Sequence, residues 1–382
     1  MGHGRRGAGG AQVQPGVLLG TDTRGLRATA RGRDVARPSI GRDRQCDGRE
    51  RDVAVRVLVT GATGFTGGWL ARHLANAGDT VRALVRHVSQ DRVGRLLDAG
   101  AEVAIGDLGD ARSLEVACHQ IEVVYHIAAM YRMAGQGAAA YRDVNVEGTR
   151  RLLEAAQTAG VRRIVHCSTG GVHGHVERPP ATEDAPLAPG DIYQETKLEG
   201  ERVARAWGEA GRLEVVVARP IGIYGPGDTR FLKLFRGIAR RRLPMLGNGG
   251  VFYHLTYVAD LVEGFRLCGT VPAAVGRTYL LAGPRYTTLR ELVALIASEL
   301  GVDPPRLALP VWPVWLAGAL CELVCVPLRI EPPLYRRRVE FYTKSRAFDA
   351  SRARRELGFN PNVDLEDGIH RTTVWYREQG ML

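Results

Sequence analysis

The stretch that decides the fold is Val55–Gly67, VRVLVTGATGFTG, in which an apolar, β-branched run ends at a glycine-rich turn. A helical pattern, WLARHLANAG, begins at Trp69. Together they predict a strand, a tight turn and a helix start. Glycines at Gly61, Gly64 and Gly67 let a phosphate approach the backbone, and the first helical turn offers unpaired N–H groups. The stretch therefore predicts a binding site for a dinucleotide pyrophosphate.

The spacing of this turn is G-x-x-G-x-x-G, which differs from the commoner G-x-G-x-x-G fingerprint. In this form, TGATGFTGG, it resembles the extended short-chain dehydrogenase/reductase family, which contains epimerases, dehydratases and hydroxysteroid dehydrogenases. The resemblance implies that the cofactor is held by the residues of the turn: Gly61, Thr63, Gly64, Phe65, Thr66 and Gly67.

Strand-like and helical segments alternate after Val55. The apolar runs are near-continuous, which indicates strands buried on both faces of a parallel sheet. The expected strands after the first are 80–86, 102–105, 123–127, 163–167 and 213–218, with helices at 144–159 and 193–207 among the connections. The predicted fold class is α/β, a Rossmann-type doubly wound parallel sheet with a smaller C-terminal substrate-binding lobe. Ligands then belong beyond the carboxyl ends of the strands.

Residues 1–52 have the composition of a disordered basic leader, with eleven Arg against five Asp and one Glu. The apolar VLLG at 17–20 is too short for a secretory signal, and no reading motif for nucleic acid accompanies the arginines, so no nucleic acid partner is expected. An extension without a task, or a mis-assigned start codon, is the favoured interpretation. The NAD(P)-binding domain is expected at 53–220. Residues 221–382 mainly form the substrate lobe, with some segments returning to the sheet.

The 382-residue chain is 45% hydrophobic and 24% charged, as expected of an ordinary globular protein, and its net charge is +11. Its six cysteines include no C-x-x-C pair, and its histidines form no cluster at metal-ligand spacing. We therefore expect no metal site and no disulfide framework. A reducing, cytoplasmic location follows from the same cysteine pattern.

Arg86 follows the second strand, where an acidic residue would bind the adenosine ribose and repel a 2′-phosphate. An arginine does the reverse, so the cofactor is NAD or NADP with NADP favoured, unless Arg86 is only a solvated surface charge. The resemblance implies that Asp107 and Leu108 contact the adenine. After the next strand, Ala128 and Ala129 are small enough for the cofactor to lie against the backbone.

Tyr193 and Lys197 stand four residues apart at the start of a helix, which places phenol and ammonium on one face. A nearby cation helps a tyrosine, whose unperturbed pKa is about 10, to exchange a proton near neutral pH. Ser168 and Thr169 end the fifth strand. The set resembles the family's Ser/Thr-Tyr-Lys triad, in which the hydroxyl polarises the substrate oxygen. Whether Ser168 or Thr169 has this role stays open, although the count back from Val172 favours Thr169.

The same resemblance implies further roles. Lys197 also holds the nicotinamide ribose, Pro220 and Ile223 pass close to the nicotinamide, and Asn145 lies near the active site, where the alternative is a helix N-cap. The resemblance extends over roughly residues 55 to 378, and the family's habit of pairing helices makes a homodimer the expected assembly.

Two departures from the family narrow the reaction. Family dehydratases carry an Asp-Glu pair directly after the active-site Thr, whereas Gly170 and Gly171 follow Thr169 here. Nucleotide-sugar epimerases place an Arg for the substrate diphosphate seven residues before the Asp matched to Asp260, and here that position is Tyr253. Three other sets of arginines are candidates to replace that charge: Arg230, Arg285 and the Arg240–Arg242 cluster.

The most apolar stretch is Leu309–Leu328, LPVWPVWLAGALCELVCVPL, whose three prolines and Glu322 argue against a membrane span. Three interpretations stay open: a helix buried in the substrate lobe, a wall of an apolar pocket, and a peripheral membrane contact with Trp312 and Trp315 at the interface. The basic residues 336–338 just beyond would suit an anionic lipid surface.

We expect an NAD(P)-dependent oxidoreductase that interconverts a secondary alcohol and a ketone, with Tyr193 as the acid/base. The C-terminal half resembles 3β-hydroxysteroid and sterol-carboxylate dehydrogenases, which favours an apolar sterol- or isoprenoid-like substrate. A nucleotide-sugar epimerase is the alternative enzyme. A non-catalytic dinucleotide-sensing protein is the alternative from another class, and the intact Tyr193/Lys197 pair argues against it.

Overall fold

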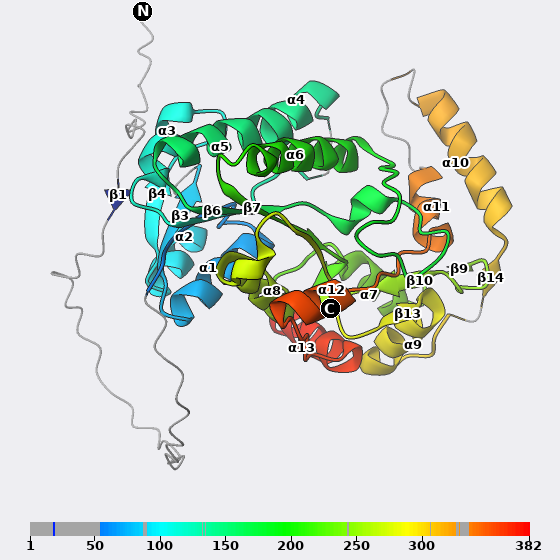
Figure 1. Cartoon of the computed structure of the whole chain (residues 1–382). Coiled ribbons are helices and arrows are strands. Elements are labelled where there is room, and N and C mark those ends of the chain that lie inside the picture. Colours follow the sequence, from blue (N-terminus) through cyan, green and yellow to red (C-terminus); the bar gives the residue numbers. More distant parts are fainter. Residues whose placement is uncertain are drawn as a thin grey trace, which may run out of the picture.

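The computed structural model describes residues 18–19, 54–86, 90–131, 133, 135–242, 244–305, 307–325, 328 and 336–382 (Figure 1). The expected leader, 1–52, lies outside these residues except for Leu18–Leu19. Those two form β1, which pairs antiparallel with β4 (Glu102–Ile105) at one end of the main sheet.

Seven parallel strands make up the rest of that sheet. Their spatial order is β4-β3-β2-β5-β6-β7-β12, so the chain begins near the middle and winds outward in both directions. Their bounds are β2 (Arg56–Thr60), β3 (Thr80–Val85), β4 (Glu102–Ile105), β5 (Val123–His126), β6 (Arg163–Cys167), β7 (Glu214–Pro220) and β12 (Thr278–Leu281). The expected strands match these within one or two residues, and the doubly wound fold class is confirmed.

Two layers of helices cover the sheet (Figure 1). One hydrophobic core joins it to α1 and α8, and a second joins its other face to α3, α5 and α6. The helices are α1 (Phe65–Asn76), α2 (Gln90–Asp98), α3 (Ala111–Cys118), α4 (Ala138–Arg142), α5 (Gly148–Thr158), α6 (Ile192–Glu209), α7 (Leu232–Ala239), α8 (Val258–Thr270), α9 (Leu289–Leu300), α10 (Val311–Cys325), α11 (Arg336–Thr343), α12 (Ser351–Leu357) and α13 (Leu365–Glu378).

The smaller lobe has a core of its own beside the carboxyl end of the sheet. Helices α7, α9 and α13 enclose it, together with the antiparallel pair of β10 (Phe252–His254) and β13 (Tyr286–Thr288). Segments beyond residue 220 also return to the sheet, because β12 pairs with β7 and α8 packs against α1. The pocket described below therefore has one wall from each lobe.

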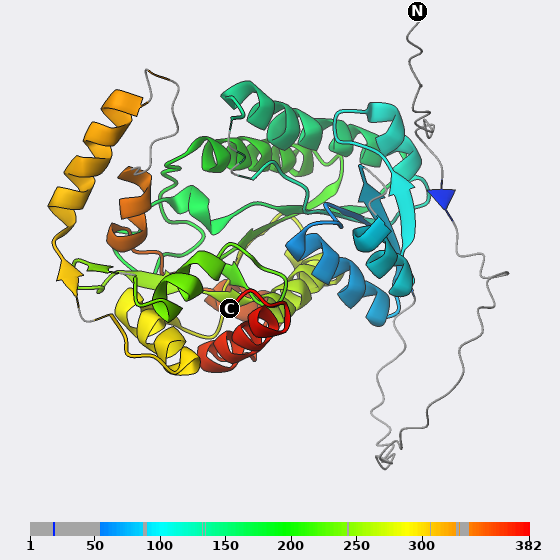
Figure 2. The same cartoon turned by 180° about the vertical axis from the view of Figure 1, so that it is seen from behind.

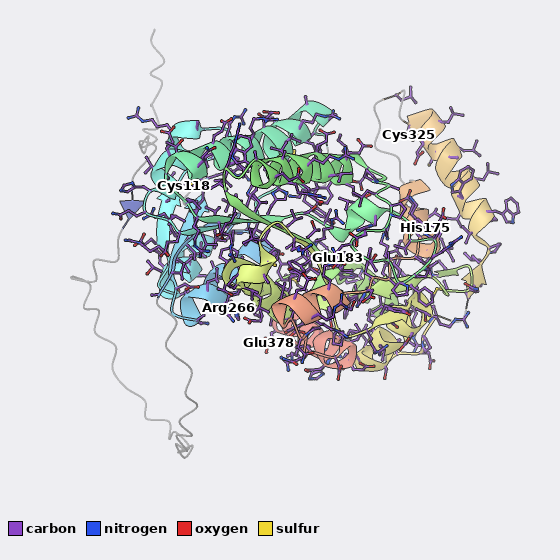
Figure 3. All side chains as sticks on the ribbon, viewed as in Figure 1. Cys118, His175, Glu183, Arg266, Cys325 and Glu378 are labelled. Atoms are coloured by element: carbon purple, nitrogen blue, oxygen red, sulfur yellow. The ribbon has the colours of Figure 1, made fainter. Side chains whose placement is uncertain are left out.

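Helix α10 stands at the rim of the molecule, packed mainly on α11 (Figures 1 and 2). Gly318 is its one buried residue, while Trp312 is 69% exposed and Leu323 is 71% exposed. Figure 3 shows its side chains projecting from the ribbon up to Cys325. The interpretation of this stretch as a buried helix is therefore wrong, because the lobe's core is filled by other elements. No helix within the described residues is long and apolar enough to cross a membrane.

The glycine turn between β2 and α1 is packed so tightly that side chains are excluded. Gly61 has φ +70°, and its carbonyl accepts a hydrogen bond from Gly64 N at 2.9 Å. A Cβ on Gly67 would lie 2.2 Å from Gly61 O. Helix α1 begins without a side-chain cap and without an acidic residue in its first turn. Its first N–H groups are therefore left for an anion from outside the chain.

Replacing Gly67 by Ala should lower the free energy of unfolding by about 1–3 kcal/mol, because the new methyl group forces α1 away from the turn. Gly94→Ala in α2, where nothing lies within 4 Å of the new Cβ, is the matched control and should raise it by up to about 1 kcal/mol. Urea unfolding of both variants measures the difference. Equal stability of the two variants would contradict the tight packing of the turn.

Candidate active site

Helix α6 positions the two residues of the predicted Tyr-Lys pair. Asp191 caps the helix by accepting a hydrogen bond from Gln194 N at 2.9 Å. Tyr193 is half-buried in the first turn and borders a pocket, with the ring of Tyr131 packed edge-on against it at 4.8 Å. Lys197, one turn later, is 2% exposed. The phenol thus reaches the pocket, whereas Lys197 is buried and is not among the residues that line it.

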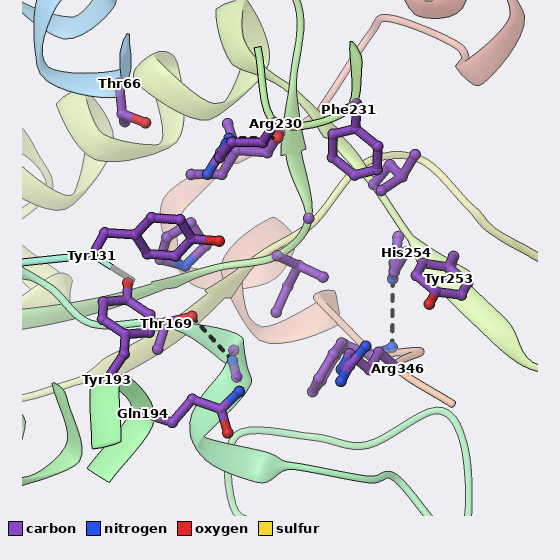
Figure 4. Close-up of a pocket in the computed structure, with 18 of the residues that line it drawn as sticks. Thr66, Tyr131, Thr169, Tyr193, Gln194, Arg230, Phe231, Tyr253, His254 and Arg346 are labelled. Atoms are coloured by element: carbon purple, nitrogen blue, oxygen red, sulfur yellow. Dashed lines mark hydrogen bonds between the residues drawn. The ribbon is translucent and has the colours of Figure 1, made fainter. Parts of the chain in front are cut away.

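The sequence leaves open whether Ser168 or Thr169 supplies the hydroxyl of the triad. In the structure the two side chains have different hydrogen-bond partners. Ser168 is buried, and its hydroxyl donates a hydrogen bond of 2.6 Å to the carboxylate of Glu201. The Thr169 hydroxyl accepts a hydrogen bond from Gly171 N at 3.1 Å, so its own proton is available to donate. Figure 4 shows Thr169 beside Tyr193 in the pocket. This geometry favours Thr169 as the hydroxyl that meets a substrate.

A buried ion pair connects α6 to the sheet. Arg219 of β7 donates two hydrogen bonds to Glu201, of 3.1 and 2.6 Å, and both side chains are at most 2% exposed. Arg219 also donates to Glu183 O at 2.9 Å and faces His173 Nε2 at 3.1 Å. Burial and the Arg219 charge lower the pKa of His173 to about 4, so that this imidazole accepts as a neutral ring.

Lys197 has two neutral histidines as neighbours within the sheet. Burial, with the Lys197 charge second, lowers the pKa of His126 to about 3 and holds that of His166 far below its usual range. Burial also lowers the pKa of Lys197 itself, opposed by Cys167 and Glu201. Because neither histidine takes up a proton near neutral pH, neither adds a positive charge beside Lys197.

Asn145 lies in a π-helical segment, Asp143–Glu147, between α4 and α5. Its side-chain amide donates to Met130 O at 3.2 Å and to Thr196 Oγ1 at 3.0 Å, and its oxygen accepts from Met130 N at 2.8 Å. The alternative role as a helix N-cap is wrong, because the helix already begins upstream at α4. Asn145 instead fastens the segment after β5 to α6, beside Tyr193.

A pocket of about 680 Å³ opens between the two lobes (Figure 4). Thr169 and Tyr193 stand at one end, and Tyr253, His254 and Arg346 stand at the other. The predicted site residues that line it are Thr66, Ala129, Ser168, Thr169, Tyr193, Pro220 and Ile223. Gly61, Thr63, Gly64, Phe65, Gly67, Arg86, Asp107, Leu108 and Ala128 do not line it, but follow the ends of β2 to β5 along the same edge of the sheet.

The sheet edge fits a dinucleotide. The glycine turn leaves no room for side chains, and the start of α1 carries unpaired N–H groups. Arg86 is 75% exposed, with its guanidinium 4.0 Å from the Asp107 carboxylate. Within the described residues no group of three His, Cys, Asp or Glu side chains could hold a metal ion.

Two of the arginines that were candidates to replace the diphosphate-binding arginine are held by carboxylates of the protein. Arg230 is bound by the buried Asp228, and Arg285 by Glu291 and Glu366 outside the pocket. Arg230 lines the pocket, and so does Arg346, which sequence reasoning missed. Its backbone pairs with Tyr253 although the two lie far apart in sequence, so no local pattern could have identified it.

A family model, the NAD dependent epimerase/dehydratase family, matches residues 57–282, which is more than half of the chain. The chain belongs to the NAD dependent epimerase/dehydratase family. The expected resemblance to the extended short-chain dehydrogenase/reductases is therefore confirmed, and the protein is an NAD-dependent enzyme of this extended kind.

Relatives within this family act on different substrates. The chain is 32% identical to sterol demethylase protein B of Methylococcus capsulatus, over 85% of this chain and 99% of that protein. It is 30% identical to UDP-glucose 4-epimerase of Mycolicibacterium smegmatis, over 85% of this chain and 99% of that one. The structure of DesIV, a dTDP-glucose 4,6-dehydratase from Streptomyces venezuelae solved with NAD bound, has a TM-score of 0.67 at 28% identity, covering 85% of this chain and 97% of that chain.

Replacing Glu201 by Leu should lower the free energy of unfolding by about 3–5 kcal/mol, because it leaves the Arg219 charge buried without its partner. Glu209→Leu, at the exposed end of the same helix, should change it by less than about 0.5 kcal/mol. Urea unfolding of the single variants and of Glu201→Leu/Arg219→Leu tests the pair. A double variant as unstable as the sum of the single variants would show that the two side chains are not coupled.

Proposed function

We propose that the protein is an NAD(P)-dependent oxidoreductase that interconverts a secondary alcohol and a ketone on a largely apolar substrate. The observation that carries the proposal is the pairing of the Tyr193 and Thr169 hydroxyls at one end of a pocket whose other walls are mainly apolar. When bound, the nicotinamide gives or accepts a hydride. Thr169 donates a hydrogen bond to the substrate oxygen, Tyr193 exchanges its proton, and the buried Lys197 cation favours the phenolate.

The local geometry argues against dehydration of a nucleotide sugar. Gly170 occupies the position where family dehydratases have an acid, and a Cβ there would lie 2.0 Å from the Ile221 side chain. An acid at this position would therefore have to displace the terminal methyl group of Ile221. A nucleotide-sugar epimerase stays the second candidate, favoured by the cationic Arg346 beside Tyr253 and by the similarity to UDP-glucose 4-epimerase.

Tyr193→Phe should lower kcat at least about a hundredfold while cofactor affinity stays within about twofold, because only the proton-exchanging oxygen is lost. Tyr286→Phe, an exposed tyrosine outside the pocket, is the matched control. Absorbance of reduced nicotinamide, followed with a sterol-like alcohol and with UDP-glucose, measures both. Formation of epimerised sugar without net cofactor reduction would show an epimerase and contradict the dehydrogenase. Full activity of Tyr193→Phe would show that Tyr193 takes no part in catalysis.

We further propose that NADP is preferred. Arg86 lies at the end of β3, exposed enough to meet a 2′-phosphate, and its nearest carboxylate is 4.0 Å away. Arg86→Asp should raise the Kd for NADP about tenfold or more, since it replaces a charge-assisted contact by a repulsion, and should not raise the Kd for NAD, whose ribose hydroxyls an acidic side chain can bind. Fluorescence titration with both cofactors measures the ratio. An unchanged ratio would make Arg86 a solvated surface charge.

The exposed α10 also needs a partner, and we propose an anionic lipid surface. The helix carries exposed apolar side chains and has a tryptophan near its start, which suits a position in the headgroup layer. The exposed residues Arg240–Arg242 precede β9 (Met245–Leu246), whose partner β14 (Ala308–Leu309) leads into α10. Positive charge thus lies beside the apolar helix, as an anionic membrane requires.

Leu320→Asp/Leu323→Asp should lower the fraction that floats with phosphatidylserine-containing vesicles at least about tenfold, because each leucine loses about 1.5–3 kcal/mol of apolar burial. Leu97→Asp, at an exposed leucine of α2, should float like the wild type. Light scattering of the same variants distinguishes a subunit interface. A dimer that dissociates in the double variant, without flotation of the wild type, would make α10 a contact between two copies instead.

A further inference from the structure

The pocket carries an excess of positive charge at the end far from Tyr193. Three cationic side chains line it, Arg230, Lys233 and Arg346, and no Asp or Glu is among its described lining residues. Arg346 stands beside Tyr253 and His254, across the pocket from Thr169 and Tyr193 (Figure 4). A cation in a partly enclosed apolar site is costly unless an anion accompanies it.

Arg230 is not the source of this excess. It donates hydrogen bonds of 2.8 and 3.1 Å to the two oxygens of Asp228, which is 2% exposed. The guanidinium also lies over the rings of Phe65 at 5.5 Å and Tyr131 at 5.8 Å. Its charge and its hydrogen-bond donors are therefore already engaged by other residues of the protein.

Arg346 and Lys233 lack such a counter-ion among the described residues, since no carboxylate of that part of the chain pairs with either of them. Arg346 is nevertheless held in place. Its backbone N–H donates to Phe252 O at 2.8 Å, and its guanidinium is a hydrogen-bond neighbour of the Tyr253 hydroxyl, which itself donates to Phe341 O. The position of the charge is thus set by the β10 strand.

His254 neither adds to this charge nor offsets it. Its Nδ1 accepts a hydrogen bond from Phe348 N at 3.4 Å, which leaves Nε2 to donate to Gly283 O at 3.0 Å. Burial lowers its pKa, in agreement with a neutral ring. The end of the pocket near β10 therefore offers the Arg346 cation, and the pocket has several apolar walls, among them Leu234, Phe341 and Phe348; the exposed Lys233 is a second cation of the lining.

We propose that Arg346, assisted by Lys233, binds an anionic group of the substrate at the end of the pocket opposite Tyr193. The guanidinium fork can hold a carboxylate or a phosphate through two hydrogen bonds. This inference rests on the proposed function, which places the reacting alcohol at Tyr193. The substrate is then an elongated apolar alcohol or ketone with an anionic group at its far end. A neutral alcohol of the same shape would leave the two cations uncompensated.

The test compares a 3β-hydroxysteroid that carries a side-chain carboxylate with its methyl ester and with UDP-glucose. Wild-type protein, Arg346→Gln, Arg346→Lys and the surface control Arg150→Gln are assayed with saturating cofactor. Calorimetry of each compound with the protein–cofactor complex gives affinity independently of turnover. We expect the wild type to bind the acid about tenfold to a hundredfold more tightly than the ester.

In Arg346→Gln this preference should disappear, because KM rises for the acid and much less for the ester, while Arg346→Lys should restore part of the preference. Equal affinity of the wild type for acid and ester, and an unaltered affinity for UDP-glucose in Arg346→Gln, would overturn the anion site and leave the dehydrogenase intact. If the protein epimerises UDP-glucose and the KM for UDP-glucose rises in Arg346→Gln, the anion site is supported as a diphosphate site. The same result would overturn the proposal of an apolar alcohol as the substrate.

Discussion

The buried pair of Arg219 and Glu201 is the interaction on which the site depends. It joins β7 to α6, and through the Ser168 hydroxyl it also holds the end of β6. The three elements that carry Thr169, Tyr193 and the floor of the pocket are thereby fixed to one another. Since a buried charge without its partner is costly, each member of the network keeps the others in place.

The pocket itself follows from the way the chain crosses between lobes. The parallel sheet places the ends of β2, β5, β6 and β7 along one edge, where a cofactor belongs. The second lobe, built on α7, α9 and α13, then faces that edge and encloses the space beyond Tyr193. The sheet thus positions the groups that act on the substrate hydroxyl, whereas the second lobe forms the walls that select the substrate.

Substrate choice within this family depends on a few side chains at the pocket wall. Ile221 packs against Gly170, so an acid there would have to displace the end of that side chain. Tyr253 takes the position of the diphosphate-binding arginine and turns its hydroxyl to Phe341, while Arg346 brings a cation to the same place from a distant segment. The pocket therefore carries a positive charge beside Tyr253, which a comparison of motifs alone does not show.

The sequence by itself determined the strands, the glycine turn and the Tyr193/Lys197 spacing. These features depend on local periodicity and on backbone conformations that few residue types adopt. It also sufficed for the family. The tertiary structure alone gave Ser168 and Thr169 different hydrogen-bond partners, placed Asn145 in a π-helical segment, brought Arg346 into the pocket and exposed α10. Each of these depends on which distant residue becomes a neighbour: Glu201 for Ser168, Met130 for Asn145, Tyr253 for Arg346 and the filled core of the lobe for α10. Such pairings arise from packing over the whole chain, so no local pattern encodes them.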